Sequence, residues 1–187
     1  MTSYANRRLY DIFMEHGVLR GDFTLSSGEK SSYYFDGRMV SLHPEGACLI
    51  GKIIYDIILP AGAEAVGGMT LGADPIATAV AVVSYLEDNP ISAFIVRDST
   101  KCHGTKKLVE GHLHFGSCVA IVDDVVTTGW SMMNAIETVE KACCAVVAVV
   151  ALLDRQQGGS EEIKKRGYEF RSILTADSSG NVRLSEE

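Results

Sequence analysis

Two adjacent carboxylates and a cluster of hydroxyl groups stand together in residues 120–135, AIVDDVVTTGWSMMNA. Asp123 and Asp124 close a run of apolar β-formers, and a helix-like pattern begins a few residues later. The turn between them supplies hydroxyl donors and a glycine: Thr127, Thr128, Gly129 and Ser131. The first N–H groups of a helix are unpaired and attract anions, whereas carboxylates accept hydrogen bonds from sugar hydroxyls and stabilise positive charge. The segment therefore predicts a site for a phosphorylated sugar.

Another interpretation of the same residues is a helix N-cap beside one structural acid, because Asp, Ser and Thr are common caps. The segment lacks the lysine of the GxxxxGK[ST] motif, which excludes a P-loop.

Composition limits the kinds of partner. A formal net charge of -7 argues against non-specific binding to nucleic acid or to an anionic membrane. The longest apolar run, residues 142–153, is shorter than the roughly 20 residues of a membrane span. The five cysteines show no CxxC pair, and the N-terminus has no continuous apolar core of a signal peptide. We therefore expect a cytoplasmic protein with small-molecule partners, no nucleic acid and no membrane.

Strands and helices must position the two acids, and the apolar pattern predicts both. The 187 residues favour one domain. The predicted elements are a helix at 4–16, a hairpin in FTLSSGEKSSYYFDGRMV, strands at 63–68, 91–97, 119–123 and 145–152, and helices at 45–59, 74–87 and 131–142. Alternating strands and helices indicate a parallel sheet covered on both faces. Ligands bind beyond the carboxyl ends of such strands, where Asp123 and Asp124 are placed.

Residues 98–116 are polar, basic and punctuated by glycine, without a convincing period. A connection of this length is often a functional lid, and a merely solvated loop is the alternative.

The segment VAIVDDVVTTGWS resembles the phosphoribosyl-pyrophosphate (PRPP) signature of type I phosphoribosyltransferases. Three further stretches resemble the orotate phosphoribosyltransferase branch in the same order: FTLSSGEKSSYYFD, VRDSTKCHGTKKLVEG and ALLDRQQGG. With GGMTLGADPIATAVA they cover residues 23–159. The resemblance implies an α/β fold, with a central parallel sheet flanked by helices and a small hood formed by the N- and C-terminal segments. It also implies one domain over residues 1–187, with a flexible catalytic loop at about 98–116.

The resemblance implies an activity as well. The family transfers ribose 5-phosphate from PRPP to orotate, which gives orotidine 5'-monophosphate and pyrophosphate in the synthesis of UMP. Mg²⁺ is expected as cofactor, carried mainly by substrate oxygens with no direct protein ligand. A homodimer is expected, in which the lid loop reaches across to the neighbouring subunit.

Particular residues match the family's site. The residues implied to bind PRPP are Thr70, Leu71, Gly72, Arg97, Lys101, His103, Asp123, Asp124, Val125, Val126, Thr127, Thr128, Gly129, Trp130 and Ser131. Of these, the catalytic residues implied are Lys101, His103, Asp123 and Asp124. Arg97, Lys101 and His103 match positions that neutralise pyrophosphate, where preorganised charge contributes most to catalysis.

For orotate, Arg155 matches the position that meets the carboxylate of the base, and the other residues implied are Thr127, Tyr34, Phe35, Ser26 and Lys30. A planar guanidinium suits a carboxylate. Core packing is the alternative for Tyr34 and Phe35, and a surface ion pair is the alternative for Arg155.

The chain departs from the family in four places. Many relatives carry lysine at the position of Asp98, and some carry lysine at Leu71 or Gly72 and at Ser26. Trp130 is bulkier than the residue usual at its position. Two rival functions follow. A phosphoribosyltransferase for another base would not need Arg155. A non-catalytic ligand-sensing regulator would keep Asp123 and Asp124 while losing the lid chemistry.

Overall fold

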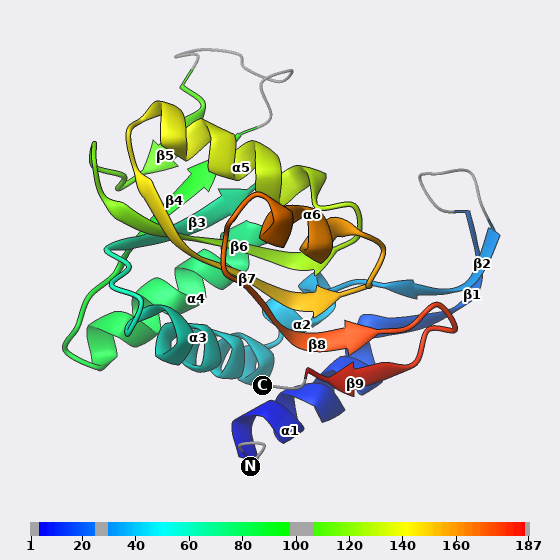
Figure 1. Ribbon diagram of the computed structural model, residues 1–187. Coiled ribbons are helices and arrows are strands. Elements are labelled where there is room, and N and C mark those ends of the chain that lie inside the picture. The colour runs from blue at the N-terminus through cyan, green and yellow to red at the C-terminus, as the bar shows by residue number, and fades with distance from the viewer. Residues whose placement is uncertain (1–3, 25–29, 98–106, 186–187) are drawn as a thin grey trace.

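A seven-stranded sheet forms the centre of the protein, which is described by a computed structural model over residues 4–24, 30–97 and 107–185 (Figure 1). The strand order is β5-β4-β3-β6-β7-β8-β9. The strands are β3 (Ala65–Met69), β4 (Ser92–Val96), β5 (Val109–Gly111), β6 (Cys118–Val126), β7 (Ala145–Asp154), β8 (Phe170–Ala176) and β9 (Val182–Leu184). The five central strands are parallel, whereas β5 and β9 pair antiparallel at the two edges.

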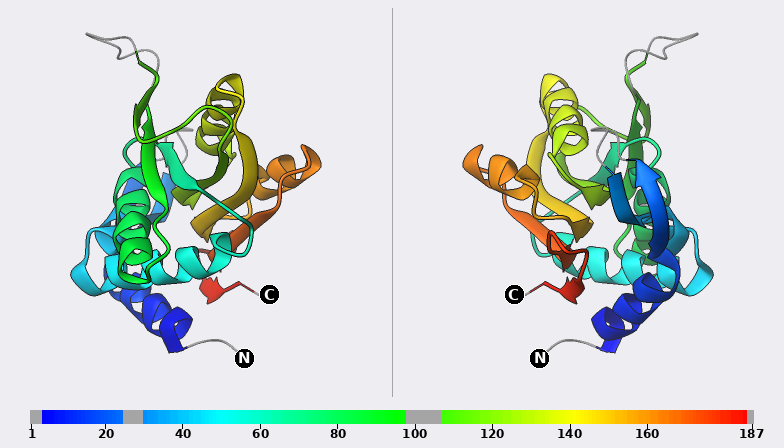
Figure 2. Two further views of the ribbon diagram at one scale, coloured as in Figure 1. Left: turned by 90° about the vertical axis from the view of Figure 1, so that its left-hand side faces the viewer. Right: turned by 90° about the vertical axis from the view of Figure 1, so that its right-hand side faces the viewer.

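Helices cover both faces of the sheet (Figures 1 and 2). One face carries α3 (Pro44–Ile58) and α4 (Ala73–Leu86), and the other carries α5 (Trp130–Lys141) and α6 (Gly159–Lys165). Successive residues of β6 alternate between the two cores, with Val122 packed on the α3 side and Ile121 on the α5 side. The predicted fold class and the buried central strands are thereby confirmed.

The N- and C-terminal segments gather on one side of the sheet, as the predicted hood requires (Figure 2). They comprise α1 (Tyr4–Ile12), a π-helical turn η1 (Phe13–Gly17), a hairpin of β1 (Val18–Thr24) and β2 (Lys30–Phe35), α2 (Arg38–Ser41), and β9. The hydroxyl of Tyr33 in the hairpin donates to the carbonyl of Ser178, 3.2 Å away, beside β9. The hairpin is therefore joined to the C-terminal segment.

Several boundaries differ from the prediction. Residues 38–40, predicted within the hairpin, belong to α2 (Arg38–Ser41), because Asp36 accepts a hydrogen bond from the N–H of Arg38 and turns the chain. The predicted loop 98–116 contains β5 at its C-terminal end, and β6 continues to Val126 rather than ending at 123. We did not predict α6, β8 or β9. Within the described part of the chain, no helix is both long and apolar enough to cross a membrane.

Candidate functional site

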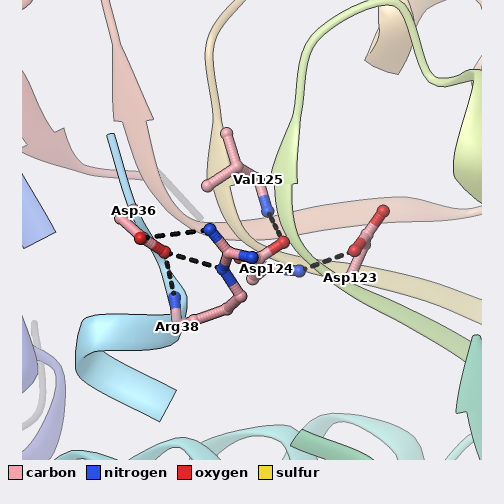
Figure 3. Close-up of polar contacts among 5 residues, drawn as sticks. All are labelled: Asp36, Arg38, Asp123, Asp124 and Val125. Atoms are coloured by element: carbon pink, nitrogen blue, oxygen red, sulfur yellow. Dashed lines mark hydrogen bonds and ion pairs between the residues drawn. The ribbon is translucent and has the colours of Figure 1, made fainter. Parts of the chain in front are cut away.

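The two acids lie on β6, within its last four residues, at the carboxyl end of the sheet. Asp123 is 7% exposed, and Asp124 is half-buried. The N–H of Asp124 donates to Oδ1 of Asp123 at 3.0 Å, and the N–H of Val125 donates to Oδ1 of Asp124 at 2.9 Å (Figure 3). Each carboxylate is therefore oriented by the next peptide group.

Burial places both carboxylates in an environment that disfavours their charge. Burial, together with the neighbouring charge of Asp124, holds the pKa of Asp123 well above its usual range. Burial also raises the pKa of Asp124, against the opposing effects of the Val125 N–H and the Arg38 guanidinium. The pair therefore favours a ligand that brings hydroxyl donors or positive charge.

A turn of three residues joins β6 to α5 and forms the mouth of a cavity. Gly129 occupies the N-cap of α5 with a left-handed φ of 78°, which glycine adopts at low cost. No threonine or aspartate side chain caps the helix from that position, so the capping interpretation is wrong. The cavity measures about 220 Å³ and is lined by Asp123, Val125, Val126, Thr127, Thr128, Gly129, Trp130, Ser131 and Met132. It combines unpaired helix N–H groups with hydroxyls, which is the chemistry of a phosphate site.

The backbone of Gly159 supports this turn from behind. Its N–H donates to the carbonyl of Thr127 at 3.0 Å. A Cβ at Gly159 would lie 2.6 Å from that carbonyl oxygen and 2.7 Å from the nitrogen of Gly129. Residue 159 must therefore be glycine for the turn to keep its place. The sequence signal for this support is the Gly-Gly pair after Arg155.

The loop at residues 70–72, between β3 and α4, lies against the two acids. The N–H of Thr70 donates to the carbonyl of Val96 at 3.0 Å, which holds the loop beside the end of β4. A Cβ at Gly72 would lie 2.4 Å from Oδ1 of Asp124 and 2.5 Å from Oδ1 of Asp123. The peptide bond from Thr70 to Leu71 is cis. The structure thus brings Thr70, Leu71 and Gly72 together with the acid pair, with the Leu71 side chain exposed.

Arg97 follows β4 at the same edge of the sheet. Its N–H donates to the carbonyl of Leu108 at 2.8 Å, and its Nη1 lies 3.4 Å from Oε1 of Glu110 on β5. Arg97, just before the predicted lid, is therefore tied to Leu108 and Glu110 in the second half of that segment. Lys101 and His103 lie outside the described residues.

Arg155 follows β7 and is tied to the end of β6, since its N–H donates to the carbonyl of Val126 at 2.9 Å. Its guanidinium lies over the ring of Phe35, 5.7 Å from the ring centre. Phe35 is 5% exposed and belongs to the core, so core packing is correct for this residue, although the ring also supports Arg155. The structure therefore places Arg155 next to the phosphate turn rather than in a surface ion pair.

The other predicted base-site residues are more dispersed. Tyr34 is 37% exposed and its ring packs near that of Phe23, at 5.8 Å between centres. Lys30 begins β2 with an exposed side chain. The hairpin of β1 and β2 projects away from the sheet (Figure 1). Ser26 lies outside the described residues.

Sequence reasoning missed the contribution of residues 36–38 to the site. A Cβ at Gly37 would lie 2.8 Å from Cβ of Asp124, so this backbone packs directly on the second acid. Arg38 donates to both oxygens of Asp36, at 2.9 and 3.1 Å, and its guanidinium lies between Asp36 and Asp124 (Figure 3). The signal in the sequence was the Asp-Gly-Arg run directly after the aromatic strand.

The described residues contain no group of three or more His, Cys, Asp or Glu side chains placed to hold a metal ion.

Comparison with known proteins agrees with this geometry. No family model matches the chain. The chain is similar to the orotate phosphoribosyltransferase of Nostoc sp., with 47% identity over 174 residues, which cover 92% of this chain and 84% of the relative. It is also similar to the solved structure of Mycobacterium tuberculosis orotate phosphoribosyltransferase in complex with Fe(III) dicitrate, with a TM-score of 0.82 and 37% identity over 91% of this chain and 96% of that one.

The same mycobacterial enzyme has been solved in complex with PRPP. That structure matches with a TM-score of 0.78 and 36% identity, again over 91% of this chain and 96% of the other. The identity to the Nostoc relative extends over most of both chains. The chain belongs to the orotate phosphoribosyltransferase family.

Proposed function

We propose that this protein transfers ribose 5-phosphate from PRPP to N1 of orotate, giving orotidine 5'-monophosphate and pyrophosphate for UMP synthesis. The observation that carries the proposal is the cavity at the N-terminus of α5, whose wall includes Asp123. Asp124 follows it on β6, and Arg155 lies at the same end of the sheet. A new bond forms between N1 of the base and C1 of the ribose, and the proton of N1 passes to the departing pyrophosphate. The bond from C1 to the pyrophosphate oxygen breaks, and its electron pair leaves with pyrophosphate.

The turn at residues 127–131 binds the 5-phosphate through backbone N–H groups and the hydroxyls of Thr127, Thr128 and Ser131. Asp123 and Asp124 accept hydrogen bonds from the ribose hydroxyls. As the C1–oxygen bond breaks, positive charge develops on the ribose ring, and the two buried carboxylates stabilise it. Preorganised charges in a site of low polarity are the strongest means of lowering such a barrier.

Pyrophosphate leaves on the other side, toward the loop at 70–72 and Arg97. Lys101 and His103 on the lid, together with Arg97, neutralise the charge that develops there. Residues 70–72 present backbone to the leaving group, which agrees with the close approach of Gly72 to the acids. Mg²⁺ bound to PRPP oxygens would supply further neutralisation of the pyrophosphate.

Orotate stands between the ribose and Arg155, whose guanidinium pairs with the carboxylate of the base. The ring of Phe35 holds that guanidinium in place, at 5.7 Å from the ring centre. Tyr34, Ser26, Lys30 and Thr127 complete the base site. An uncharged base would leave Arg155 without its partner, so a phosphoribosyltransferase for another base is less well supported.

The protein acts as a homodimer in which the lid at about 98–116 reaches the neighbouring active site. Support comes from α4, where Val82, Tyr85 and Leu86 are 56%, 73% and 74% exposed on one helix. Large apolar side chains gathered in this way mark an interface. The reaction takes place in the cytoplasm, and the four described cysteines are free thiols, as a reducing compartment favours.

The test combines purified protein, Mg²⁺ and PRPP with orotate, and follows the loss of orotate together with the release of pyrophosphate. Matched consumption of orotate, absent with uracil or hypoxanthine, is the expected result. Turnover with hypoxanthine or uracil instead would assign another base. Binding of PRPP without turnover of any base would indicate the ligand-sensing regulator.

A further inference from the structure

Arg38 has no role in the reaction described above, yet its guanidinium lies next to the second acid. Arg38 begins α2, and its side chain folds back so that Nε and Nη2 donate to the two oxygens of Asp36, at 2.9 and 3.1 Å. The N–H of Arg38 donates to the same carboxylate at 3.1 Å. Three hydrogen bonds to one carboxylate fix the place of the guanidinium.

Residues 36–38 are in firm contact with Asp124. A Cβ at Gly37 would lie 2.8 Å from Cβ of Asp124 and 3.0 Å from its Oδ2, so no side chain can separate this segment from the acid. Figure 3 shows the Arg38 guanidinium between the carboxylates of Asp36 and Asp124. Since the hydrogen bonds of Arg38 go to Asp36, its positive charge acts on Asp124 through space.

We propose that Arg38 is a positioning residue of the reaction, held by Asp36, whose charge keeps the buried carboxylate of Asp124 ionised before PRPP binds. The proposal rests on the proposed function, since it assigns Arg38 to the same site. Asp124 must be ionised to accept hydrogen bonds from ribose and to stabilise the positive charge that develops there. Burial opposes that state, and a nearby positive charge favours it.

The charges around Asp124 act in opposite directions. Asp123 faces it from the same strand, Asp36 and Arg38 face it from the segment after β2, and the loop at 70–72 presents the backbone of Gly72. Burial and the charge of Asp36 raise the pKa of Asp124, whereas the N–H of Val125, the Arg38 guanidinium and the side chain of Asp123 lower it. Removal of Arg38 and removal of the Asp36 charge should therefore shift the ionisation of Asp124 in opposite senses.

The sign of each shift follows from the requirement for an ionised Asp124. Activity is lost as pH falls through the pKa of that carboxyl group. Arg38→Met should raise this pKa. The acid limb of the pH profile, which is the pH range where kcat/KM for PRPP falls on acidification, should then move upward by about 0.5 to 1 pH unit. The shift is kept small because Arg38 is partly exposed and solvent screens its charge. Asp36→Asn should move the limb downward by about 0.3 to 0.5 pH unit, because it removes a negative charge and frees Arg38 to approach Asp124.

The experiment measures kcat/KM for PRPP against pH in the intact enzyme and in four variants, with thermal unfolding of each at the same pH values. Arg38→Lys keeps the charge and should leave the limb within about 0.2 pH unit of the wild type. Arg171→Met is the matched control, because this arginine pairs with Glu169 on an exposed surface and should not move the limb. Titration of PRPP itself is common to every variant and cancels in the comparison.

Opposite shifts in Arg38→Met and Asp36→Asn, with Arg38→Lys close to wild type, would support the proposal. Unshifted limbs, or shifts in the same direction, would overturn it. If Arg38→Met does not fold, the role of Arg38 is decided by the other two variants: the acid limb should shift downward in Asp36→Asn and stay near the wild-type position in Arg38→Lys. A wild-type protein without turnover would overturn the proposed function, whereas an active wild type with unshifted variants would overturn only the role of Arg38.

Discussion

Gly72→Ala tests whether the loop at 70–72 and the two acids act as one unit. Gly72 has φ −60° and ψ −43°, a conformation that alanine adopts without strain. The effect of the substitution therefore comes from the space around the added methyl group. That methyl would lie 2.4 Å from Oδ1 of Asp124 and 2.5 Å from Oδ1 of Asp123. Both distances are shorter than the 3.4 Å at which ordinary van der Waals contact begins.

The size of the effect follows from these distances. Either the carboxylates or the loop must move by about 1 Å, and a misplacement of that size typically costs about 100-fold in rate. The clashing atoms are the free ends of two side chains that can rotate, so the free energy of unfolding should fall by only about 1 kcal/mol. We expect a large loss of kcat/KM for PRPP in a protein that still folds.

The assay is pyrophosphate release with PRPP and orotate at saturating Mg²⁺, paired with chemical denaturation. Gly21→Ala is the matched control, because the nearest atom to its added methyl is a ring carbon of Phe23 at an ordinary 3.4 Å. This variant should keep wild-type activity. If Gly72→Ala remained within about threefold of the wild type while folding normally, a 1 Å displacement of the acids would be harmless and the reasoning would fail.

Three further substitutions test other parts of the site. Arg155→Met should raise KM for orotate about 100-fold and leave KM for PRPP within about threefold, because only orotate loses its charged partner; equal rises in both constants would contradict this. Gly159→Ala puts a methyl 2.6 Å from the carbonyl of Thr127, a backbone atom that cannot rotate away, so the free energy of unfolding should fall by about 2 kcal/mol and PRPP titration should show weaker binding. Asp123→Asn should abolish most turnover. It should nevertheless raise the free energy of unfolding at pH 8 by about 1 to 2 kcal/mol. The reason is that the pKa of Asp123 is raised in the folded protein, so its negative charge destabilises the fold at pH values above that pKa. That gain should disappear at pH 4, where the buried acid is protonated, and denaturation curves at the two pH values would show whether it does.

The local sequence pattern was sufficient to predict the central strands of the sheet and the order in which the candidate site segments follow one another along the chain. The apolar runs around Ile121 and Val150 predicted central strands because strands buried on both faces have no polar side to alternate. The turn after Asp124 was predicted as an anion site because a strand, a glycine and a helix start follow one another directly. These features depend on residues that are neighbours in sequence, and a resemblance to known motifs supplied the rest of the site.

Local pattern was not sufficient for the edges of the sheet. The strands β5 and β9 contain three residues each, too few to show a period, and they are strands only because β4 and β8 offer open edges to pair with. The short helix α6 was missed for a similar reason, since its seven residues provide less than two turns of pattern.

The sequence by itself determined the fold class and the place of the acid pair and of the turn before α5, because each depends on periodicity and on adjacent residues. The tertiary structure alone decided what surrounds Asp124: Gly37 and Arg38 from the hood, and Gly72 from the loop after β3. It also decided that Phe35, a core residue, supports the guanidinium of Arg155. The physical reason is that the ionisation of a buried carboxylate depends on charges and backbone within a few ångströms, and folding brings those groups from distant parts of the chain.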